Sequence, residues 1–103
     1  MEDLAHAVER LTAAGYRDDF RAEPDGLRDV NTGRIHAPES LVVGEIVRFE
    51  GESDPDDEVV LFALESASHD TRGTYVVTYG TYVDPLDAEM MRRLSRSAAR
   101  SRT

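Results

Sequence analysis

The chain places its densest group of carboxylates directly before its most apolar run. Six acids lie between Glu50 and Glu58, and the apolar segment Val59–Leu64 follows at once. Carboxylate oxygens are hard ligands, which suit Mg²⁺ or Ca²⁺. The candidate metal ligands in this segment are Glu50, Asp54, Asp57 and Glu58.

The same segment also has the pattern of a charged connector between two strands. Its spacing departs from the calcium-loop pattern, because Glu58 takes the third acidic position and no Gly follows it. Asp54-Pro55 suits the opening of a turn, in which Pro favours the second position. We therefore expect a solvated connector whose charges discourage edge pairing, with the metal site as the alternative. No cofactor is expected.

The three histidines, His6, His36 and His69, show neither H-x₃-H nor H-E-x-x-H spacing, so we expect structural or exposed roles for them. His69 precedes Asp70, and such a pair can do acid–base work near neutral pH. The chain has neither a Cys nor a G-x-S-x-G element for this pair to activate. No catalytic residue is assigned.

Two tyrosines form another candidate surface. Tyr75 and Tyr79 share one face of a predicted strand, and Tyr82 lies on the opposite face. An aromatic sheet face can stack nucleic-acid bases, or it can pack into a core or against another subunit. We favour the core or the subunit contact, because the acidic body of the chain opposes a phosphate backbone.

Charge is distributed unevenly along the chain. Residues 1–91 hold all 21 acids and a net charge of −14, whereas residues 92–103 hold five Arg and no acid. A basic end can contact nucleic acid, an acidic partner or the protein's own acids, and the residues that would do so are Arg92, Arg93 and Arg96. It can also be a helix end that frays, and we expect residues 97–103 to form a frayed or disordered tail.

Composition bounds the class of protein. The 103 residues, 40% of them hydrophobic and 32% charged, suffice for one modest core, so we expect one domain over residues 1–103. No apolar run approaches the roughly 20 residues that span a bilayer. The N-terminus is acidic where a signal peptide is basic. The sequence thus predicts a cytoplasmic protein without membrane contact, and the absence of Cys excludes disulfides.

All twelve basic residues are Arg. A high-GC genome favours Arg over Lys, and a salt-adapted proteome favours acidic chains that lack Lys, because a large net charge keeps proteins soluble once repulsion is screened. Both explanations stay open. The second one would make an acidic patch uninformative about function.

The periodicity of apolar residues predicts an α+β domain. We expect a helix over Glu2–Ala14, a hairpin around Asn31–Gly33 and a second helix that starts at Asp84-Pro85. Further strands are predicted over Leu41–Glu50, Val59–Glu65 and Thr74–Val83. The result is a mostly antiparallel sheet of about five strands, with an N-terminal and a C-terminal helix.

Strand Val59–Leu64 is apolar on both sides, so both faces of the sheet need a cover. We expect the two helices to cover one face. The N-terminal strands or a second copy of the chain would then cover the other face, and a homodimer is the hypothesis that follows.

Four motifs occur in order along the chain. They are Gly15-Tyr16-x-x-Asp19-Phe20, Arg48-Phe49-Glu50-Gly51-x-Ser53-Asp54-Pro55-x-Asp57-Glu58, Leu61-Phe62-Ala63 and Tyr79-Gly80-x-Tyr82. With them the chain resembles, over nearly its whole length, a family of small uncharacterised bacterial proteins. Some members carry the genome label "phosphoribosylpyrophosphate synthetase". The resemblance implies a fold and a family but no catalytic residue, since the enzymes of that name are much longer and carry a diphosphate-binding signature that is absent here.

These observations favour a non-enzymatic interaction or structural module. The alternative from another class is a small metal- or ligand-dependent enzyme that uses the acidic residues 50–58. A nucleic-acid-binding module that acts through the Arg-rich C-terminus is the third hypothesis, and nucleic acid is not the partner that the net charge of −9 favours.

Overall fold

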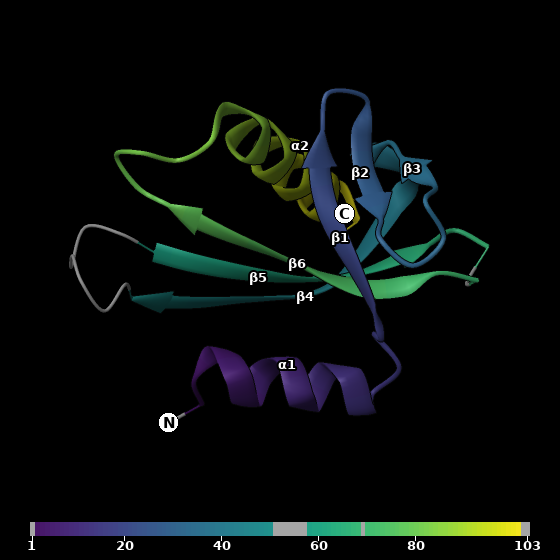
Figure 1. Cartoon of the computed structure of the whole chain (residues 1–103), viewed down its shortest axis with the longest axis horizontal. Helices are drawn as coiled ribbons and strands as arrows, with labels where there is room; N and C mark the ends of the chain where they lie inside the picture. The colour runs from purple at the N-terminus through teal and green to yellow at the C-terminus, as the bar shows by residue number, and fades with distance from the viewer. Residues whose placement is uncertain (1, 51–57, 69, 102–103) are drawn as a thin grey trace.

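The computed structural model of the chain describes residues 2–50, 58–68 and 70–101. Figure 1 shows the elements in chain order, which are α1 (Leu4–Ala13), β1 (Asp18–Glu23), β2 (Gly26–Asp29), β3 (Ile35–His36), the 3₁₀ turn η1 (Pro38–Ser40), β4 (Leu41–Glu50), β5 (Glu58–Ser66), β6 (Arg72–Tyr79) and α2 (Pro85–Ser101). The six strands of this described part form a sheet in the order β3-β2-β1-β6-β5-β4. Neighbouring strands run antiparallel, except that β1 and β6 are parallel. The predicted α+β class is confirmed.

Strand β5 lies at the centre of the core and is apolar on both faces, as its sequence predicts. The residues on one face belong to the core beneath α2; they are Val60, Phe62 and Leu64. Those on the other face belong to the core beneath α1; they are Leu61 and Ala63. Strict alternation in a strand sends successive side chains to opposite faces, so β5 serves both cores.

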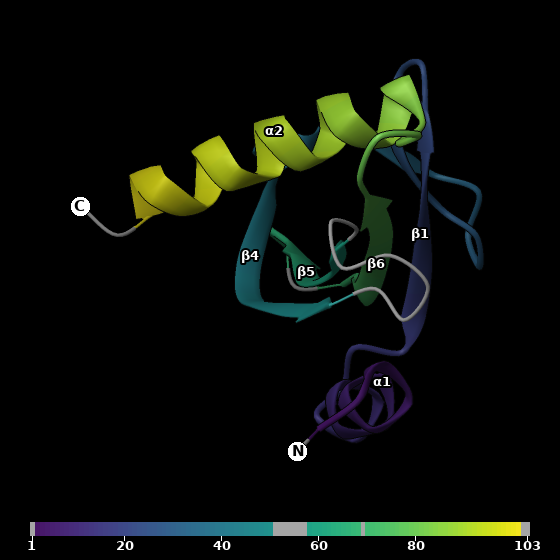
Figure 2. The same cartoon turned by 90° about the vertical axis from the view of Figure 1, so that its left-hand side faces the viewer.

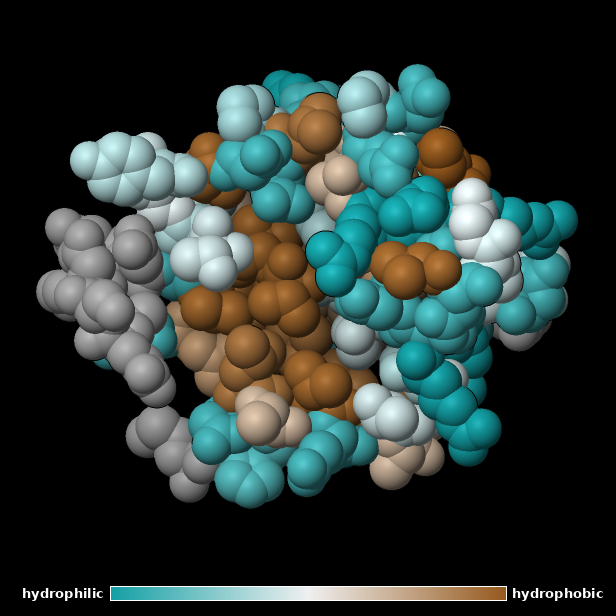
Figure 3. All heavy atoms as spheres, viewed as in Figure 1, coloured by the Kyte–Doolittle hydropathy of each residue, from teal (hydrophilic) through white to brown (hydrophobic). Residues whose placement is uncertain are grey.

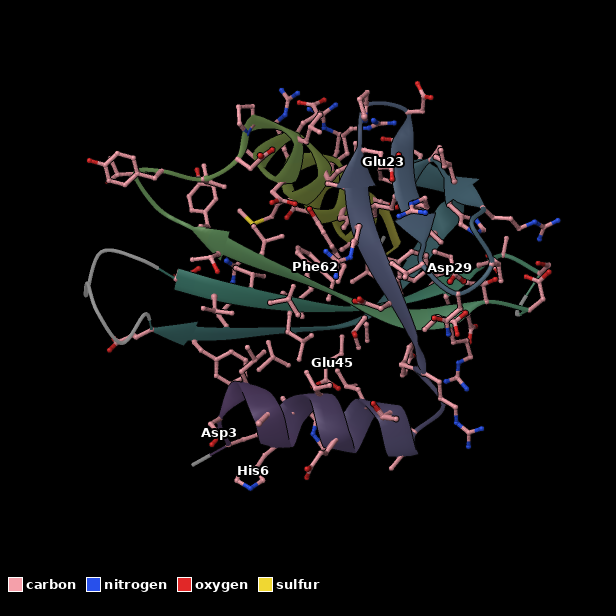
Figure 4. The ribbon with its side chains drawn as sticks, viewed as in Figure 1. Asp3, His6, Glu23, Asp29, Glu45 and Phe62 are labelled. Carbon is pink, nitrogen blue, oxygen red and sulfur yellow. The ribbon has the colours of Figure 1, made fainter. Side chains whose placement is uncertain are left out.

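The two helices lie on opposite faces of the sheet (Figure 2), and the expectation that both cover one face is wrong. Figure 4 shows Phe62 on the side of α2 and Glu45 on the side of α1. The physical reason is the two-faced β5, because each apolar face needs its own cover. One chain therefore covers both faces, and the need for a cover no longer supports a homodimer.

Strand β1 was missed by the sequence analysis. Its residues, DDFRAE, are mostly charged, and Phe20 is its one fully buried side chain. The strand forms because β2 pairs along it and because β6 pairs with its first two residues, Asp18 with Gly73 and Asp19 with Thr74. Tertiary pairing thus sets a conformation that local pattern does not signal.

Both helices begin at an aspartate cap, which the sequence analysis predicted for α2 alone. The carboxylate of Asp3 accepts a hydrogen bond of 2.9 Å from the N–H of His6, and Asp84 accepts one of 2.8 Å from the N–H of Leu86. Helix α2 continues to Ser101, and the predicted tail at residues 97–103 extends past the described part. None of the helices described is long and apolar enough to cross a membrane.

Candidate functional site

The outer edge of β6 is open along its C-terminal half. Strand β1 pairs with β6 only at Asp18–Gly73 and Asp19–Thr74, and it then continues beside β2 alone. Figure 1 shows β1 crossing in front of β6 and rising toward α2. Residues Val76–Tyr79 therefore have β5 on one side and no described strand on the other. We call this segment the β6 edge.

The ladder between β5 and β6 shows which backbone groups face the open side. The N–H of Ser66 donates to the C=O of Thr71 at 2.8 Å, so these two residues form a hydrogen-bonded pair. Antiparallel ladders alternate between hydrogen-bonded and non-hydrogen-bonded pairs. In this register, positions 73, 75, 77 and 79 of β6 bond to β5. The N–H and C=O groups of Val76 and Thr78 consequently point to the open side.

The β6 edge itself carries no charge. No charged residue occurs from Gly73 to Val83. The exposed fraction is 39% for Val76 and 43% for Tyr79, which is high for large hydrophobic residues within a strand. Figure 3 shows a hydrophobic surface between the two helices, beside β1. A partner that covered this edge would remove apolar area from water.

The opposite edge of the sheet, β4, is built differently. It carries Glu45, Arg48 and Glu50, and its register with β5 shifts between Val43 and Glu45. Charged side chains and bulges are the usual means by which proteins prevent edge strands from pairing with other chains. Residues Val76–Tyr79 carry no charge and pair with β5 in an unbroken register. The β6 edge therefore lacks this protection.

A cavity of about 410 Å³ lies where β1 leaves β6. Its polar lining residues are Asp19, Arg21, Tyr75, Asp84 and Asp87. The hydroxyl of Tyr75 donates a hydrogen bond of 2.5 Å to Oδ1 of Asp87. Burial, and after it this hydrogen bond, raises the pKa of Tyr75 far above its usual range, so the phenol stays protonated. Asp84 and Asp87 are thus used to position the start of α2.

A pair of carboxyl groups joins β1 to the turn after β2. Asp29 is fully buried, and its Oδ1 accepts hydrogen bonds from the N–H groups of Asn31 at 2.8 Å and Thr32 at 3.3 Å. Asp18 accepts a hydrogen bond of 2.9 Å from Nδ2 of Asn31. Hydrogen bonding with Asp29, followed by burial, raises the pKa of Asp18. Asp18 is therefore protonated more readily than an isolated aspartate.

Sequence reasoning missed this pair. The chain has 21 acids, and no local pattern distinguishes Asp29, which is fully buried among the described residues. The only available signal was the position of Asp29 two residues before Asn31, where a short polar side chain commonly bonds to the backbone of a turn.

The structure describes two of the four predicted metal ligands. Glu50 and Glu58 pair where β4 ends and β5 begins, and Nη1 of Arg48 donates to Oε1 of Glu58 at 2.9 Å. Asp54 and Asp57 lie outside the described residues. Within residues 2–50, 58–68 and 70–101, no three His, Asp or Glu side chains are placed to hold a metal ion. The metal hypothesis stays a prediction, because half of its ligand set is not described.

The two described histidines, His6 and His36, have the exposed and structural roles that the sequence predicts. His6 is exposed at the start of α1, with Nδ1 at 2.8 Å from Oδ1 of Asp3 (Figure 4). His36 packs edge-on against Phe20, with ring centroids 6.0 Å apart. His69 lies outside the described residues.

The two candidate tyrosines share the face of β6 that looks toward α2, as the alternation predicts. Tyr75 is buried against Phe62, with ring centroids 6.0 Å apart. Tyr79 is half-exposed and lines a shallow cavity with Pro85 and Ala88 of α2. The structure therefore separates them, with Tyr75 in the core and Tyr79 at the surface.

Two of the three candidate arginines pair with acids of the same chain. Arg93 donates two hydrogen bonds, of 2.6 and 2.7 Å, to the carboxylate of Glu39 in η1. Arg92 pairs with Glu89 one turn earlier in α2, and Arg96 is exposed. Pairing with the protein's own acids was one of the open interpretations of this basic segment.

No protein-family model, curated protein or solved structure matches the chain. The resemblance to small bacterial proteins thus stays a prediction. Among the described strands, β3 and β4 are the outer edges of the sheet, and the β6 edge is a further unpaired edge, without charge or bulge.

Proposed function

We propose that the chain is a non-enzymatic interaction module that binds another polypeptide through the β6 edge. The observation that carries the proposal is that β1 stops pairing with β6 at Thr74, while Val76 and Thr78 still direct backbone groups to that side. An extended segment added there would continue the sheet and supply partners for these groups. Exposed sheet edges without charge or bulge are the edges that accept such a strand.

The neighbouring side chains support binding rather than chemistry. Tyr75 is buried and keeps its proton, and Asp87 accepts that proton's hydrogen bond. Asp84 caps α2. Tyr75, Asp84 and Asp87 therefore have structural roles in holding α2 against β6. In line with the sequence expectations, the proposed setting is the cytoplasm of a bacterial cell, with salt adaptation as one source of the acidity.

A photo-crosslinking amino acid in place of Val76 tests the proposal in cells. The matched control carries the same amino acid in place of Ile35, which is 44% exposed on the edge strand β3. We expect covalent adducts to a second polypeptide from position 76 and few from position 35. Equal yields at both positions would contradict the proposal.

A second variant links these adducts to the strand edge itself. Thr78→Pro removes an N–H that faces the open side and leaves the bonds to β5 intact, because Pro is tolerated at such edge positions. Thr78→Val keeps the N–H and is the control. Adducts at position 76 should disappear with Pro and persist with Val. Adducts that survive Thr78→Pro would show that strand addition is not the mode of binding.

A further inference from the structure

We infer that the occupant of the β6 edge is a second copy of this chain, whose β6 pairs antiparallel with the first across a two-fold axis at Val77. The inference rests on the proposed function and names its partner.

Backbone hydrogen bonding makes the β6 edge its own complement. The edge offers four groups, the N–H and C=O of Val76 and of Thr78. In an antiparallel pair centred on Val77, Val76 of one copy lies opposite Thr78 of the other, and the reverse holds across the axis. These are hydrogen-bonded positions, so the identical segment satisfies all four groups on each copy.

The side chains across the axis match as well. Val77 meets Val77 of the second copy on the face toward α2, and Val76 meets Thr78 on the face toward α1. Pairs of β-branched residues directly opposite each other stabilise antiparallel strands. The exposed apolar surface of Val76 and the hydrophobic patch in Figure 3 would then be covered.

Charge favours a second copy over a basic segment from elsewhere. No carboxylate lies on the strand from Gly73 to Val83, so a basic segment would find no partner there. Three carboxylates line the cavity beside the edge: Asp84 accepts from an N–H of α2, Asp87 accepts from Tyr75, and Asp19 lies 4.0 Å from Arg21. Two copies can pair along this uncharged strand without placing like charges opposite each other.

The acidic remainder of each copy still opposes the association. Each chain carries a net charge of −9, and salt screens the repulsion between two such bodies. We therefore expect the dimer to strengthen as salt rises. Because both copies use the same segment, the pair is isologous and closes, and no β6 edge remains for a third copy.

Light scattering on the intact chain at low and high salt tests the partner. We expect a mass of twice 11.5 kDa, with a larger dimer fraction at high salt. Thr78→Pro should give the monomer mass, and Thr78→Val should remain dimeric. A wild-type monomer at both salt concentrations overturns the inference, and so does a dimer that Thr78→Pro leaves intact.

Disulfide trapping tests the register independently, because the chain has no Cys of its own. Val77→Cys should form a covalent dimer on oxidation, since Val77 faces itself across the axis. Thr78→Cys should not, since Thr78 faces Val76. Equal trapping of both variants overturns the register.

The two sets of experiments separate the inference from the function on which it rests. A monomeric wild type that still forms position-76 adducts with other proteins overturns the second copy and leaves the interaction module standing. A monomer without such adducts overturns both.

Discussion

The hydroxyl of Tyr75 on β6 donates a 2.5 Å hydrogen bond to Asp87 in the first turn of α2. Tyr75 is buried, with 2% of its surface exposed. A single side chain thus fixes where α2 starts relative to the strand whose outer edge is open.

Tyr75→Phe removes this hydrogen bond and keeps the ring. Loss of one hydrogen bond to a charged acceptor costs about 1.5–3 kcal/mol. For a domain of this size each kcal/mol lowers Tm by roughly 4–8 °C, which calorimetry can measure. Tyr79→Phe removes a hydroxyl from the half-exposed tyrosine on the same face and is the matched control. Equal Tm changes in the two variants would contradict this role for Asp87.

Gly73→Ala tests the junction of β1 and β6. An added Cβ would overlap the carbonyl oxygen of Asp18 and lie 2.7 Å from its carbonyl carbon, so the strands would have to separate. We expect a loss of about 1–3 kcal/mol in the free energy of unfolding, measured with urea. In Gly44→Ala the added Cβ meets the hydroxyl of Tyr16 at 2.5 Å, at the end of a side chain that can rotate. A smaller loss is expected there, and the reverse order would refute the argument.

Asp29→Asn should change how stability depends on pH. The pKa of Asp18 is raised above its ordinary 3.8 in the folded chain. The stabilisation that protonated Asp18 contributes is therefore complete below about pH 3.8 and is lost as pH rises through the folded pKa of Asp18. An Asn amide can donate to the Asp18 carboxylate at every pH, so the variant should gain on the wild type as pH rises.

The measurement is urea unfolding at several pH values between about 4 and 8, where the two chains should diverge. Asp25→Asn makes the same charge change in the exposed turn between β1 and β2 and is the control. If the difference between Asp29→Asn and wild type stays constant with pH, Asp29 is not the cause of the raised pKa of Asp18.

Arg10 joins the start of α1 to β4. It donates to Glu2 at 2.7 and 3.0 Å and to Glu45 at 2.6 and 3.0 Å. Hydrogen bonding with Arg10 lowers the pKa of Glu45. Arg10→Gln should lower Tm at low salt, and the difference should narrow at high salt, because these pairs are exposed and screened. Arg21→Gln, whose partner Asp19 lies 4.0 Å away, should leave Tm nearly unchanged.

The elements with strong local signals could be predicted from sequence. Strand Leu41–Glu50 has the bounds that its pattern predicts, and α2 begins at the predicted Pro85 after its Asp84 cap. Strand β1 could not be found, because its one buried residue, Phe20, gives no alternation. The helices lie on opposite faces because β5 is apolar on both sides. This pattern is visible in the sequence, but the predicted placement of both helices on one face did not take it into account.

The candidate surface was only partly visible in the sequence. Tyr79 was a predicted interaction residue, and the uncharged run from Gly73 to Val83 can be read directly. The open backbone of Val76 and Thr78 could not be foreseen, because it depends on where β1 stops pairing with β6. That point is set by contacts between segments distant in the chain.

The parallel pairing of β1 with β6 has a consequence for the order of folding. Strands β4, β5 and β6 pair as neighbours in the chain, whereas Asp18 must find Gly73 across roughly half of the chain. Closing such a long loop costs chain entropy before its contacts form, so we expect β1 to dock last. Until then the outer side of β6 is unpaired from Arg72 to Tyr79. During refolding at high concentration, β1 and the β6 of another chain therefore compete for the same strand, and slow docking of β1 favours aggregation.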